Sequence, residues 1–174
     1  MKSECVLSKR FINTKIGEIE VIGCATGLHA VNLSSVNKRQ RCDSCDNVNS
    51  LNESIHWLQL YFDDCSEEIK DLMVPKICES GRSSVYLNIW KELSKTEIGE
   101  TLSYSDLSER VFGHRNASRV VGTAMRRNPC PIIIPCHRVI KANGELGNYS
   151  CGNDIKAYLI NYEKVHSTLK GDNH

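Results

Sequence analysis

The sequence predicts an α/β protein in two parts, an N-terminal half in which strands precede a helix and a C-terminal half that is mainly helical. Hydrophobic residues first alternate with polar ones and later recur at helical spacing, and a segment with Pro75 and Gly81 separates the two patterns. The 174 residues suffice for two small domains of roughly 80 residues each. We therefore expect domains at 1–80 and 81–166, followed by a tail at 167–174.

The N-terminal half is expected to begin with strands. Ile19 and Val21 fall on one side of an extended segment, whereas Glu18 and Glu20 fall on the other, which is typical of a half-buried strand. A polar stretch follows, and then hydrophobic residues recur near helical spacing. In chain order, we expect extended segments at 11–13 and 16–23, a turn at 25–27, a strand at 28–33, a polar loop at 38–50 and a helix at 51–62.

Helical patterns dominate the C-terminal half. Val85, Ile89 and Leu93 recur at four-residue spacing, and Ser103 with Asp106 three residues later is typical of a capping box. Two short helices joined by a tight turn indicate a helix-turn-helix, although helical hairpins without a DNA role are common. We expect helices from 103 to 111, from 117 to 126 with Asn116 as its cap, and from 154 to 164 with Ile155, Tyr158, Leu159 and Tyr162 on one face.

The charge and the cysteine content indicate the cellular environment of the protein more clearly than its function. The 22 basic and 21 acidic residues nearly cancel, so net charge indicates no partner. Locally, 63–71 is acidic, whereas 110–138 holds six arginines and no acidic residue, which suits an anionic partner or a solvated face. Nine cysteines, no signal-peptide pattern at 1–10 and no apolar run of membrane length favour an intracellular, reducing setting. The cysteines are then thiols, metal ligands or a nucleophile.

The stretch 128–139 is the most informative part of the sequence. Its three prolines exclude a central strand and predict a rigid ledge that presents Cys136 after three buried isoleucines. The adjacent His137 suggests an activated thiol, because the thiolate is the attacking form and a neighbouring base lowers the thiol pKa. From this adjacency alone, an inert buried cysteine is the simpler interpretation. A cysteine protease is disfavoured, because its histidine lies far from its cysteine in sequence.

A resemblance to a known protein family adds to the interpretation of Cys136 as an activated thiol. The signature of O6-alkylguanine-DNA alkyltransferases closely resembles the segment Ile134-Pro135-Cys136-His137-Arg138-Val139. The segments 119–126 and 147–150 are similar to the family's recognition helix and to its following motif, and Glu163 falls at its last catalytic acid. The N-terminal half matches more loosely, through Cys5, Cys24-x4-His29 and Val74-Pro75. This resemblance implies a ribonuclease-H-like α/β domain followed by a mainly helical, winged helix-turn-helix domain.

The resemblance also implies a reaction. A thiolate attacks the alkyl carbon on guanine O6, the cysteine becomes a stable thioether, and each molecule reacts once without a catalytic cofactor. Cys136 would be the nucleophile, His137 would take its proton through a water, and Glu163 would hold the imidazole in its useful tautomer. Asn128 would brace the ledge, and Tyr104 would donate to guanine N3 as charge builds on the leaving base. Without the resemblance, the simpler interpretations are that Glu163 is a solvated helix residue, that Asn128 forms a turn and that Tyr104 is a half-buried aromatic residue.

The implied partner is double-stranded DNA that contains O6-alkylguanine, with O4-methylthymine left open as a second substrate. The damaged nucleotide must leave the base stack, and Arg119 matches the residue that fills the vacated space. The helix-turn-helix would lie in the minor groove, which permits little sequence specificity. The implied DNA-binding set is Arg119, Ala117, Ser118, Gly122, Thr123, Arg126 and Arg127, and the implied substrate pocket is formed by Val139, Tyr149, Ser150, Cys151, Met125 and Pro131.

Two residues depart from the family pattern. Cys151 stands where relatives commonly have glycine, so we expect a narrower site that accepts bulky benzyl adducts poorly. Arg127 replaces a small residue, and we expect it to add a phosphate contact.

A zinc site is expected in the N-terminal half. If the strands around the turn pair as a hairpin, Cys24 and His29 lie opposite one another on one face and form half of a site. The resemblance implies Cys5 and Cys78 as the other two ligands of a closed structural zinc site, with Cys78 where the family usually has histidine. Two alternatives remain open, a zinc knuckle built on Cys42-x2-Cys45 and free thiols in a polar loop.

The rival function is a non-catalytic, zinc-containing winged-helix protein that binds DNA or senses lesions. It would explain the helix-turn-helix and the candidate ligands but gives no reason for a cysteine beside His137. An alkyltransferase-like sensor lacks the reactive cysteine, whereas Cys136 is present. We expect a monomer in solution, binding DNA cooperatively, in the nucleus, with the cytoplasm as the alternative location.

Overall fold

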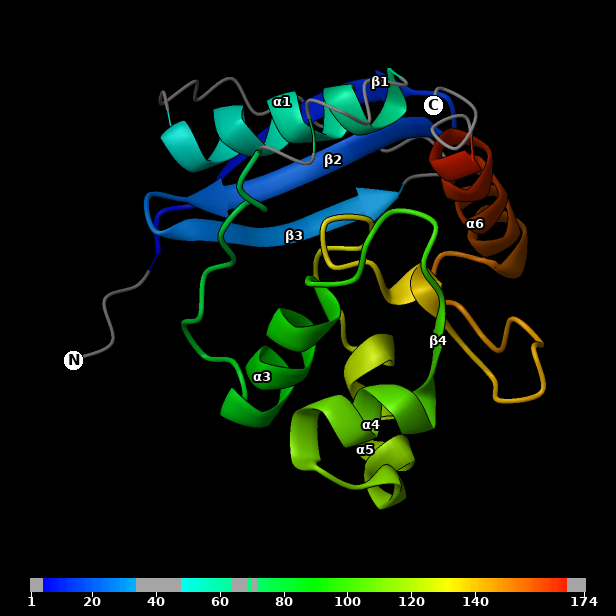
Figure 1. The fold of residues 1–174 in the computed structure, drawn as a ribbon. Coiled ribbons are helices and arrows are strands. Elements are labelled where there is room, and N and C mark those ends of the chain that lie inside the picture. The colour runs from blue at the N-terminus through cyan, green and yellow to red at the C-terminus, as the bar shows by residue number, and fades with distance from the viewer. Residues whose placement is uncertain (1–4, 34–47, 64–68, 70–71, 169–174) are drawn as a thin grey trace. The chain divides into compact units, whose positions relative to one another are not determined.

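The computed structural model describes residues 5–33, 48–63, 69 and 72–168 (Figure 1). The chain divides into two compact units, Met1–Gly81 and Arg82–His174, against expected domains at 1–80 and 81–166. The mixed α/β architecture confirms the predicted fold class. Within the described ranges, no helix combines the length and apolarity that crossing a membrane requires.

The first unit is built on a three-stranded antiparallel sheet. β1 (Ser8–Thr14) pairs with β2 (Gly17–Cys24), and β2 pairs with β3 (Gly27–Leu33). Ile19 and Val21 are buried, whereas Glu18 is exposed and Glu20 accepts a hydrogen bond from Asn32 at 2.8 Å. The predicted alternation along this strand is confirmed, because one face of the sheet packs and the other meets solvent.

One helix, α1 (Asn49–Phe62), covers a face of this sheet (Figure 1). Its buried stripe includes Leu51, Leu58 and Tyr61, and Trp57 stacks on Tyr61 with ring centroids 5.6 Å apart. Burying an aliphatic or aromatic side chain of this size contributes about 1.5–3 kcal/mol. The helix therefore forms because its apolar stripe can pack on the sheet, since its N-cap Val48 provides no side-chain hydrogen bond.

The second unit is mainly helical, with two short strands that pair in parallel. Leu102 pairs with Val139 and Ser103 with Ile140, so the start of the helix-turn-helix is joined to the chain just after Cys136. In chain order the elements are α3 (Ser84–Leu93), β4 (Leu102–Ser103), α4 (Tyr104–Phe112), the one-turn 3-10 helix η1 (Arg115–Ala117), α5 (Ser118–Arg126), the 3-10 helix η2 (Cys136–Arg138), β5 (Val139–Ile140) and α6 (Asn153–Thr168).

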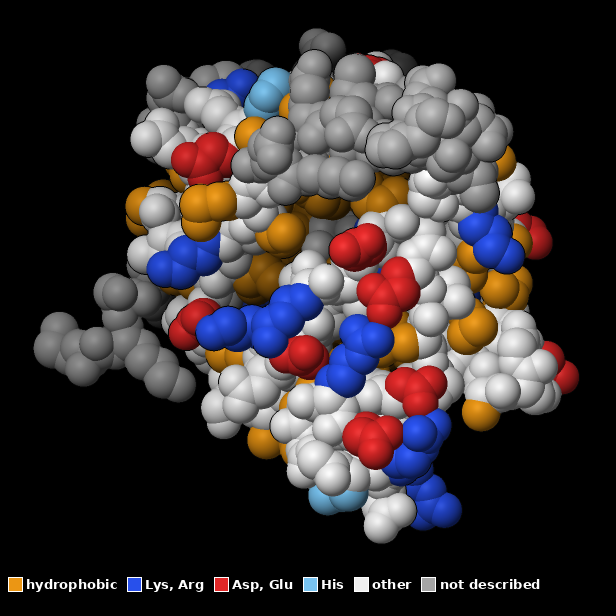
Figure 2. All heavy atoms as spheres, in the orientation of Figure 1, with side chains coloured by type: hydrophobic (Ala, Val, Ile, Leu, Met, Phe, Trp, Pro, Cys, Tyr) orange, Lys and Arg blue, Asp and Glu red, His pale blue; other side chains and the backbone are white. Residues whose placement is uncertain are grey.

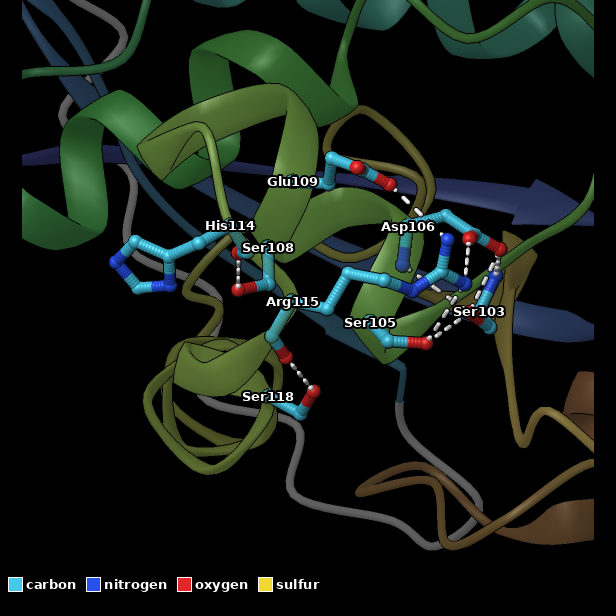
Figure 3. A network of polar contacts seen from close by, with 8 residues as sticks. All are labelled: Ser103, Ser105, Asp106, Ser108, Glu109, His114, Arg115 and Ser118. Atoms are coloured by element: carbon cyan, nitrogen blue, oxygen red, sulfur yellow. Dashed lines mark hydrogen bonds and ion pairs between the residues drawn. The ribbon is translucent and has the colours of Figure 1, made fainter.

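The helix-turn-helix is formed by α4 and α5. The predicted capping box is confirmed, because the Ser103 hydroxyl accepts from the Asp106 amide and the Asp106 carboxylate accepts from the Ser103 amide. Gly113 ends α4 at φ 74°, a left-handed conformation that favours glycine. The Ser108 hydroxyl then fixes the turn, because it donates to the His114 carbonyl at 2.7 Å (Figure 3). The same hydroxyl accepts from the Ala117 amide at 3.1 Å.

Two expectations about the C-terminal helices are wrong, although the helical spacing of Val85, Ile89 and Leu93 is confirmed by α3. Asn116 lies inside η1 and does not cap α5, whose N-cap is Ala117 without a side-chain hydrogen bond. The last helix extends through Thr168, so residues 167 and 168 belong to α6 and not to a tail, and 169–174 lie outside the described residues.

Candidate active site and metal centre

The ledge before Cys136 is fixed by one asparagine. Asn128 accepts from the Cys130 amide through Oδ1 at 2.9 Å and donates through Nδ2 to the Ile134 carbonyl at 2.8 Å. Ile132, Ile133 and Ile134 are all buried, as predicted for the three isoleucines. Ile132 has φ 74°, a left-handed conformation that is an outlier for a β-branched residue. Such strain persists only where the surrounding structure determines the backbone, and here it accompanies the turn that delivers Cys136.

The same asparagine contacts the sulfur itself. Asn128 Nδ2 lies 2.9 Å from Cys136 Sγ, and the two backbone contacts leave no alternative orientation of the amide. Sequence reasoning expected Asn128 to brace the ledge and missed this direct contact. An N–H donor directed at sulfur favours the thiolate over the thiol. Asn128 therefore both positions Cys136 and stabilises its reactive form.

Cys136 is nevertheless a neutral thiol at rest. It opens η2, its side chain is 3% exposed, and burial raises the pKa of the thiol to about 11. Asn128 offsets this rise only in part, and the neighbouring Cys151 adds to it. Since a thiol with this pKa is almost wholly protonated near pH 7, the nucleophile must lose a proton during the reaction.

His137 is placed to take a proton. Its Nε2 lies 2.8 Å from Glu163 Oε1, and Nδ1 is buried with no hydrogen-bond partner in the part of the chain described. An ionised carboxylate only accepts, so the proton sits on Nε2 and Nδ1 keeps its lone pair. Burial lowers the pKa of His137, against the opposing effect of Glu163. The imidazole is therefore neutral and can act as a base.

Glu163 is held ionised by Arg138. Burial alone would raise the pKa of the Glu163 carboxyl, but His137 and Arg138 hold it well below its usual range. Arg138 binds both carboxylate oxygens, with Nε to Oε2 and Nη2 to Oε1 each at 2.8 Å, and its Nη1 donates to the Thr96 carbonyl. The Gly99 amide adds a fourth contact to Oε2 at 3.1 Å. Every acceptor position of the buried carboxylate is thus occupied, which fixes the imidazole.

Tyr104 approaches the site from the start of α4. Its hydroxyl would lie 3.3 Å from a Cβ at Gly147, and its ring carbons lie 3.9 Å from the Cβ position of Gly122 on α5. Burial raises the pKa of Tyr104, and the negative charge that Cys136 carries as a thiolate raises it further. The phenol therefore stays protonated and can donate a hydrogen bond beside the sulfur. Gly122 and Gly147 leave room for its ring on two sides.

The other expected pocket residues lie in two groups. Tyr149 and Cys151 are half-buried, and both affect the pKa of Cys136: the charge of Cys151 raises it, whereas the Tyr149 hydroxyl lowers it, which places both near the sulfur. Ser150 between them is exposed. Val139 is fully buried, and its carbonyl accepts from Lys156 Nζ at 2.6 Å, which leaves one lone pair for a substrate. Met125 and Pro131 are buried on α5 and on the ledge.

The six arginines between 110 and 138 do not form one basic patch. Arg138 is buried on Glu163, Arg110 pairs with Glu100 at 2.8 Å, and Arg115 pairs with Asp106 and with Glu109. Figure 2 accordingly shows basic and acidic side chains next to one another over this unit, and Figure 3 shows Arg115 between its two carboxylates. The arginines without a carboxylate partner, as far as the structure is described, are Arg119, Arg126 and Arg127.

These three arginines lie on or just after α5, together with the small residues expected at a DNA surface. Arg119 and Arg126 are exposed, and Arg127 lies over the Tyr86 ring at 5.6 Å from its centroid. The remaining residues of the expected set, Ala117, Ser118, Gly122 and Thr123, are partly exposed. Among the described residues, the arginines of this region that lack a carboxylate partner thus lie on α5 or directly after it.

A cluster of three cysteines and one histidine lies in the first unit. The ligand atoms of Cys5, Cys24, His29 and Cys78 all lie within 4.8 Å of one another. Cys5 Sγ and Cys78 Sγ are 3.8 Å apart, and His29 Nε2 is 3.2 Å from Cys24 Sγ. A tetrahedral zinc with Zn–S bonds near 2.3 Å needs S–S separations of about 3.8 Å, so these residues fit the ion.

Backbone geometry brings the four candidate ligands together. Gly27 has φ 148°, and a Cβ there would lie 2.7 Å from the Lys76 carbonyl oxygen, so only glycine lets the chain before Cys78 pass this closely. Leu28 donates to Lys76 at 2.9 Å and accepts from Cys78 at 2.8 Å, which anchors that segment to β3.

The expected direct pairing of Cys24 with His29 is wrong. Cys24 pairs with Gly27 and Gly23 with Leu28, whereas Ile22 pairs with Ala30. His29 is therefore the extra residue of a β-bulge, which redirects its side chain toward the sulfur. The alternative pair, Cys42 and Cys45, lies outside the described residues.

Sequence reasoning missed three contributors to these sites. Arg138 belongs to the signature at 134–139, but its contact with Glu163 depends on tertiary packing and so could not be predicted from that segment. Lys156 and Glu163 are seven residues apart on α6 with Leu159 between them, so helical spacing could have placed all three on one buried face. Thr26 was expected only as a turn residue, but its hydroxyl contacts the sulfurs of Cys24 at 3.0 Å and Cys78 at 3.3 Å.

Comparison with known proteins covers both units. The family described as "6-O-methylguanine DNA methyltransferase, ribonuclease-like domain" matches residues 7–74, and its "DNA binding domain" matches residues 84–165. A human protein named methylated-DNA–protein-cysteine methyltransferase is 32% identical over 94% of this chain and 83% of its own length. A protein of the same name from Methanosarcina acetivorans is 36% identical over 85% of this chain and 92% of its own.

A solved structure resembles the fold as well. The crystal structure of Mycobacterium tuberculosis OGT in complex with DNA has a TM-score of 0.72 and 27% sequence identity, and the similarity covers 91% of this chain and 93% of that one. Both family domains occur in order, and the human relative matches along nearly the whole chain. The chain therefore belongs to the O6-methylguanine-DNA methyltransferase family, the methylated-DNA–protein-cysteine methyltransferases.

Proposed function

We propose that this protein repairs alkylated DNA by moving the alkyl group of O6-alkylguanine onto Cys136, once per molecule. The observation that carries the proposal is the buried Cys136 thiol, contacted by the Asn128 amide and followed by a neutral His137 whose Nδ1 has its lone pair available. These features supply a nucleophile and a base. Membership of the family supplies the substrate class, with O4-methylthymine as a second candidate substrate.

The thiol proton leaves first. Because the pKa of Cys136 is raised by burial to about 11, the sulfur needs a base, and His137 Nδ1 is the basic atom that the geometry leaves open. A water between the two groups would carry the proton, after which Glu163 stabilises the imidazolium. The thiolate then attacks the alkyl carbon, the C–O6 bond breaks, and a C–S bond forms.

Charge on the leaving guanine is neutralised by a donor. The electron pair of the broken bond goes to the purine, and the protonated Tyr104 hydroxyl donates to its N3 as that charge develops. The proton held by His137 then passes through water to the purine, so the products are guanine in DNA and S-alkylcysteine, and no external reductant or cofactor is consumed. The thioether cannot be hydrolysed under cellular conditions, and this explains a single turnover.

A duplex with one radiolabelled O6-methylguanine tests this function. We expect one equivalent of label on the protein, no further uptake after a second addition, and a mass increase of one methyl group on the peptide that contains Cys136. Binding of the lesion duplex without transfer of label would instead support the non-catalytic, lesion-sensing alternative. Transfer to a cysteine other than Cys136 would disprove the assignment of the nucleophile.

DNA binding is assigned to α5. The exposed Arg119 and Arg126 carry the charge, and Gly122 and Thr123 allow a close approach to a narrow groove. Arg119 would enter the duplex in place of the extruded nucleotide, and Arg127 would contact a phosphate from its position over Tyr86. We propose a monomer that binds double-stranded DNA cooperatively, and a nuclear location, because chromosomal DNA is the substrate.

Zinc binding is proposed for Cys5, Cys24, His29 and Cys78. Three thiolates and one imidazole form a closed set that suits a structural ion, and zinc there would stabilise the first unit. The Thr26 hydroxyl and amide, which contact Cys24 at 3.0 and 3.4 Å, would hold the ligands in place.

Metal analysis of the purified chain tests the site. We expect one zinc per chain in the wild type and none in Cys78→Ser, whereas Cys151→Ser, which removes a cysteine outside the cluster, keeps the full zinc content. The double variant Cys42→Ser and Cys45→Ser distinguishes the competing ligand pair. Loss of zinc in that double variant, with retention in Cys78→Ser, would overturn the assignment.

A further inference from the structure

A buried lysine without a carboxylate partner among the described residues binds the carbonyl of Val139, three residues after Cys136. Lys156 on α6 is 1% exposed, and among the residues that the structure describes it forms no ion pair. Its one strong contact is the hydrogen bond from Nζ to the Val139 carbonyl at 2.6 Å, and the Tyr149 ring centroid lies 6.0 Å from Nζ. A buried ammonium without a counter-ion costs several kcal/mol of stability, so its presence calls for a cause.

The charges around Cys136 do not balance at rest. Arg138 and Glu163 cancel one another, and His137 is neutral, so the ammonium of Lys156 leaves the buried cluster with one net positive charge. Formation of the thiolate at Cys136 brings this sum to zero. The ionisable groups that interact electrostatically with Cys136 or with its neighbour His137 are, from η2, Arg138; from α6, Lys156 and Glu163; from the segment before α6, Tyr149 and Cys151; and from α4, Tyr104.

We propose that Lys156 is the buried counter-charge of the Cys136 thiolate, and that the nucleophilicity of Cys136 depends on this positive charge. The proposal deepens the alkyl-transfer function and rests on it only for its biological use. Burial lowers the pKa of Lys156 to about 8, so the side chain remains charged near neutral pH. Its charge lowers the pKa of Cys136 and that of His137, which favours both the thiolate and the neutral base.

A purely structural role would give different behaviour. If Lys156 only anchored the Val139 carbonyl, an uncharged donor would replace it, and a side chain without a donor would disturb β5. If the charge matters, a neutral residue of similar length should leave the fold intact and weaken the thiol. Replacing a buried unpaired charge by a well-packed apolar side chain is often neutral or stabilising. Lys156→Met should therefore unfold at a temperature no lower than that of the wild type.

The experiment measures the alkylation of Cys136 by iodoacetamide without DNA, followed by peptide mass mapping from pH 6 to pH 9. We expect Lys156→Met and Lys156→Gln to react about tenfold more slowly than the wild type, as a rise of one pKa unit in Cys136 gives. Lys156→Arg should stay within about threefold of the wild type, because it keeps the charge. The matched control Lys141→Gln removes an exposed lysine that pairs with Glu145, and it should not change the rate.

The outcomes separate this inference from the function. Equal rates and an unchanged pH profile in the Met, Gln and Arg variants would overturn the counter-charge. If Lys156→Met does not fold, the comparison of Lys156→Gln with Lys156→Arg decides in the same way. A second arm measures transfer from an O6-methylguanine duplex. Absence of transfer in the wild type would refute the proposed function, whereas slow iodoacetamide reaction in the neutral variants would still support the counter-charge.

Discussion

The two units each hold a cysteine beside a histidine, and their surroundings make them chemically different. In the first unit, Cys24 lies 3.2 Å from His29 and within 4.8 Å of two further thiols, so a cation can be shared among four ligands. In the second, Cys136 belongs to no comparable ligand cluster among the described residues, and the nitrogen of His137 that forms a hydrogen bond is directed at Glu163. These different neighbours support the two proposed roles, a metal ligand for Cys24 and a nucleophile for Cys136.

The difference is visible in the acidity of the thiols. Partial burial opposes ionisation of Cys24, but donors from Thr26 and His29 lower the pKa of Cys24 to about 6. At Cys136, burial outweighs the opposing effects of Asn128, Tyr149 and Lys156 and raises the pKa to about 11. A thiolate that is stable at rest suits a permanent ligand, whereas a thiol that ionises only during the reaction is protected from chance electrophiles.

Replacing each of the two cysteines by alanine in turn tests this comparison most directly. We expect Cys136→Ala to abolish transfer of a labelled methyl group and to keep one zinc per chain. Cys24→Ala should lose the zinc and retain full transfer at a temperature where the second unit remains folded. The amount of label on the protein measures transfer, and metal analysis measures the zinc content. Loss of transfer in Cys24→Ala while the second unit stays folded would show that the two clusters do not act separately.

Removal of the buried carboxylate should have the next largest effect. Glu163→Gln leaves Arg138 buried without a negative partner, and breaking such a pair costs about 3–5 kcal/mol of stability. Denaturant unfolding measures this change. Glu145→Gln is the matched control, because its exposed pair with Lys141 should contribute nothing measurable. Equal stability of the two variants would contradict the role given to the buried network.

Acid should destabilise the second unit in two steps. Burial lowers the pKa of His137 below its ordinary 6.5, so below that pH the unfolded chain binds a proton that the folded chain does not. The pKa of Glu163 is likewise held below its ordinary 4.5, against burial, by His137 and Arg138. Both groups therefore stabilise the fold at neutral pH, and each loses this contribution as the pH falls, by about 1.4 kcal/mol per pH unit.

Denaturant unfolding at pH 8, 6, 5 and 4 measures these two steps. The step below 4.5 should disappear in Glu163→Gln, which has no carboxyl group to protonate. A flat stability from pH 8 to pH 5 would contradict the assignment of a neutral buried imidazole to His137.

The smallest expected effect concerns Cys151, which is half-buried and whose charge acts on Cys136. Cys151→Gly removes the side chain beside the sulfur and should raise the rate with O6-benzylguanine, by about tenfold at most, because one small group in a pocket has an effect of this order. The rate with O6-methylguanine serves as the internal reference, because any effect of Cys151 on the pKa of Cys136 changes both rates alike, so the ratio of the benzyl rate to the methyl rate should rise. An unchanged benzyl rate would show that Cys151 does not narrow the site.

The sequence alone determined much of this protein because its informative features are local. Alternation in β2, the capping box at Ser103 and the isoleucines before Cys136 each follow from neighbouring residues, and all three are found in the structure. The reactive-site signature is also contiguous, so the family could be inferred before any fold was known. The roles assigned to Cys136, His137 and Glu163 from that signature stay predictions until the labelling experiment is done.

Only the tertiary structure decided the features that depend on distant partners. The expected apolar face of α6 is wrong in part, because Tyr158 is 38% exposed while Lys156 and Glu163 are buried. Burying these charged side chains is possible only because Val139 and Arg138 arrive from other segments to satisfy them. The bulge at His29 likewise depends on strand pairing. Local patterns cannot reveal such partners, because the free energy of a buried charge depends on what the fold places beside it.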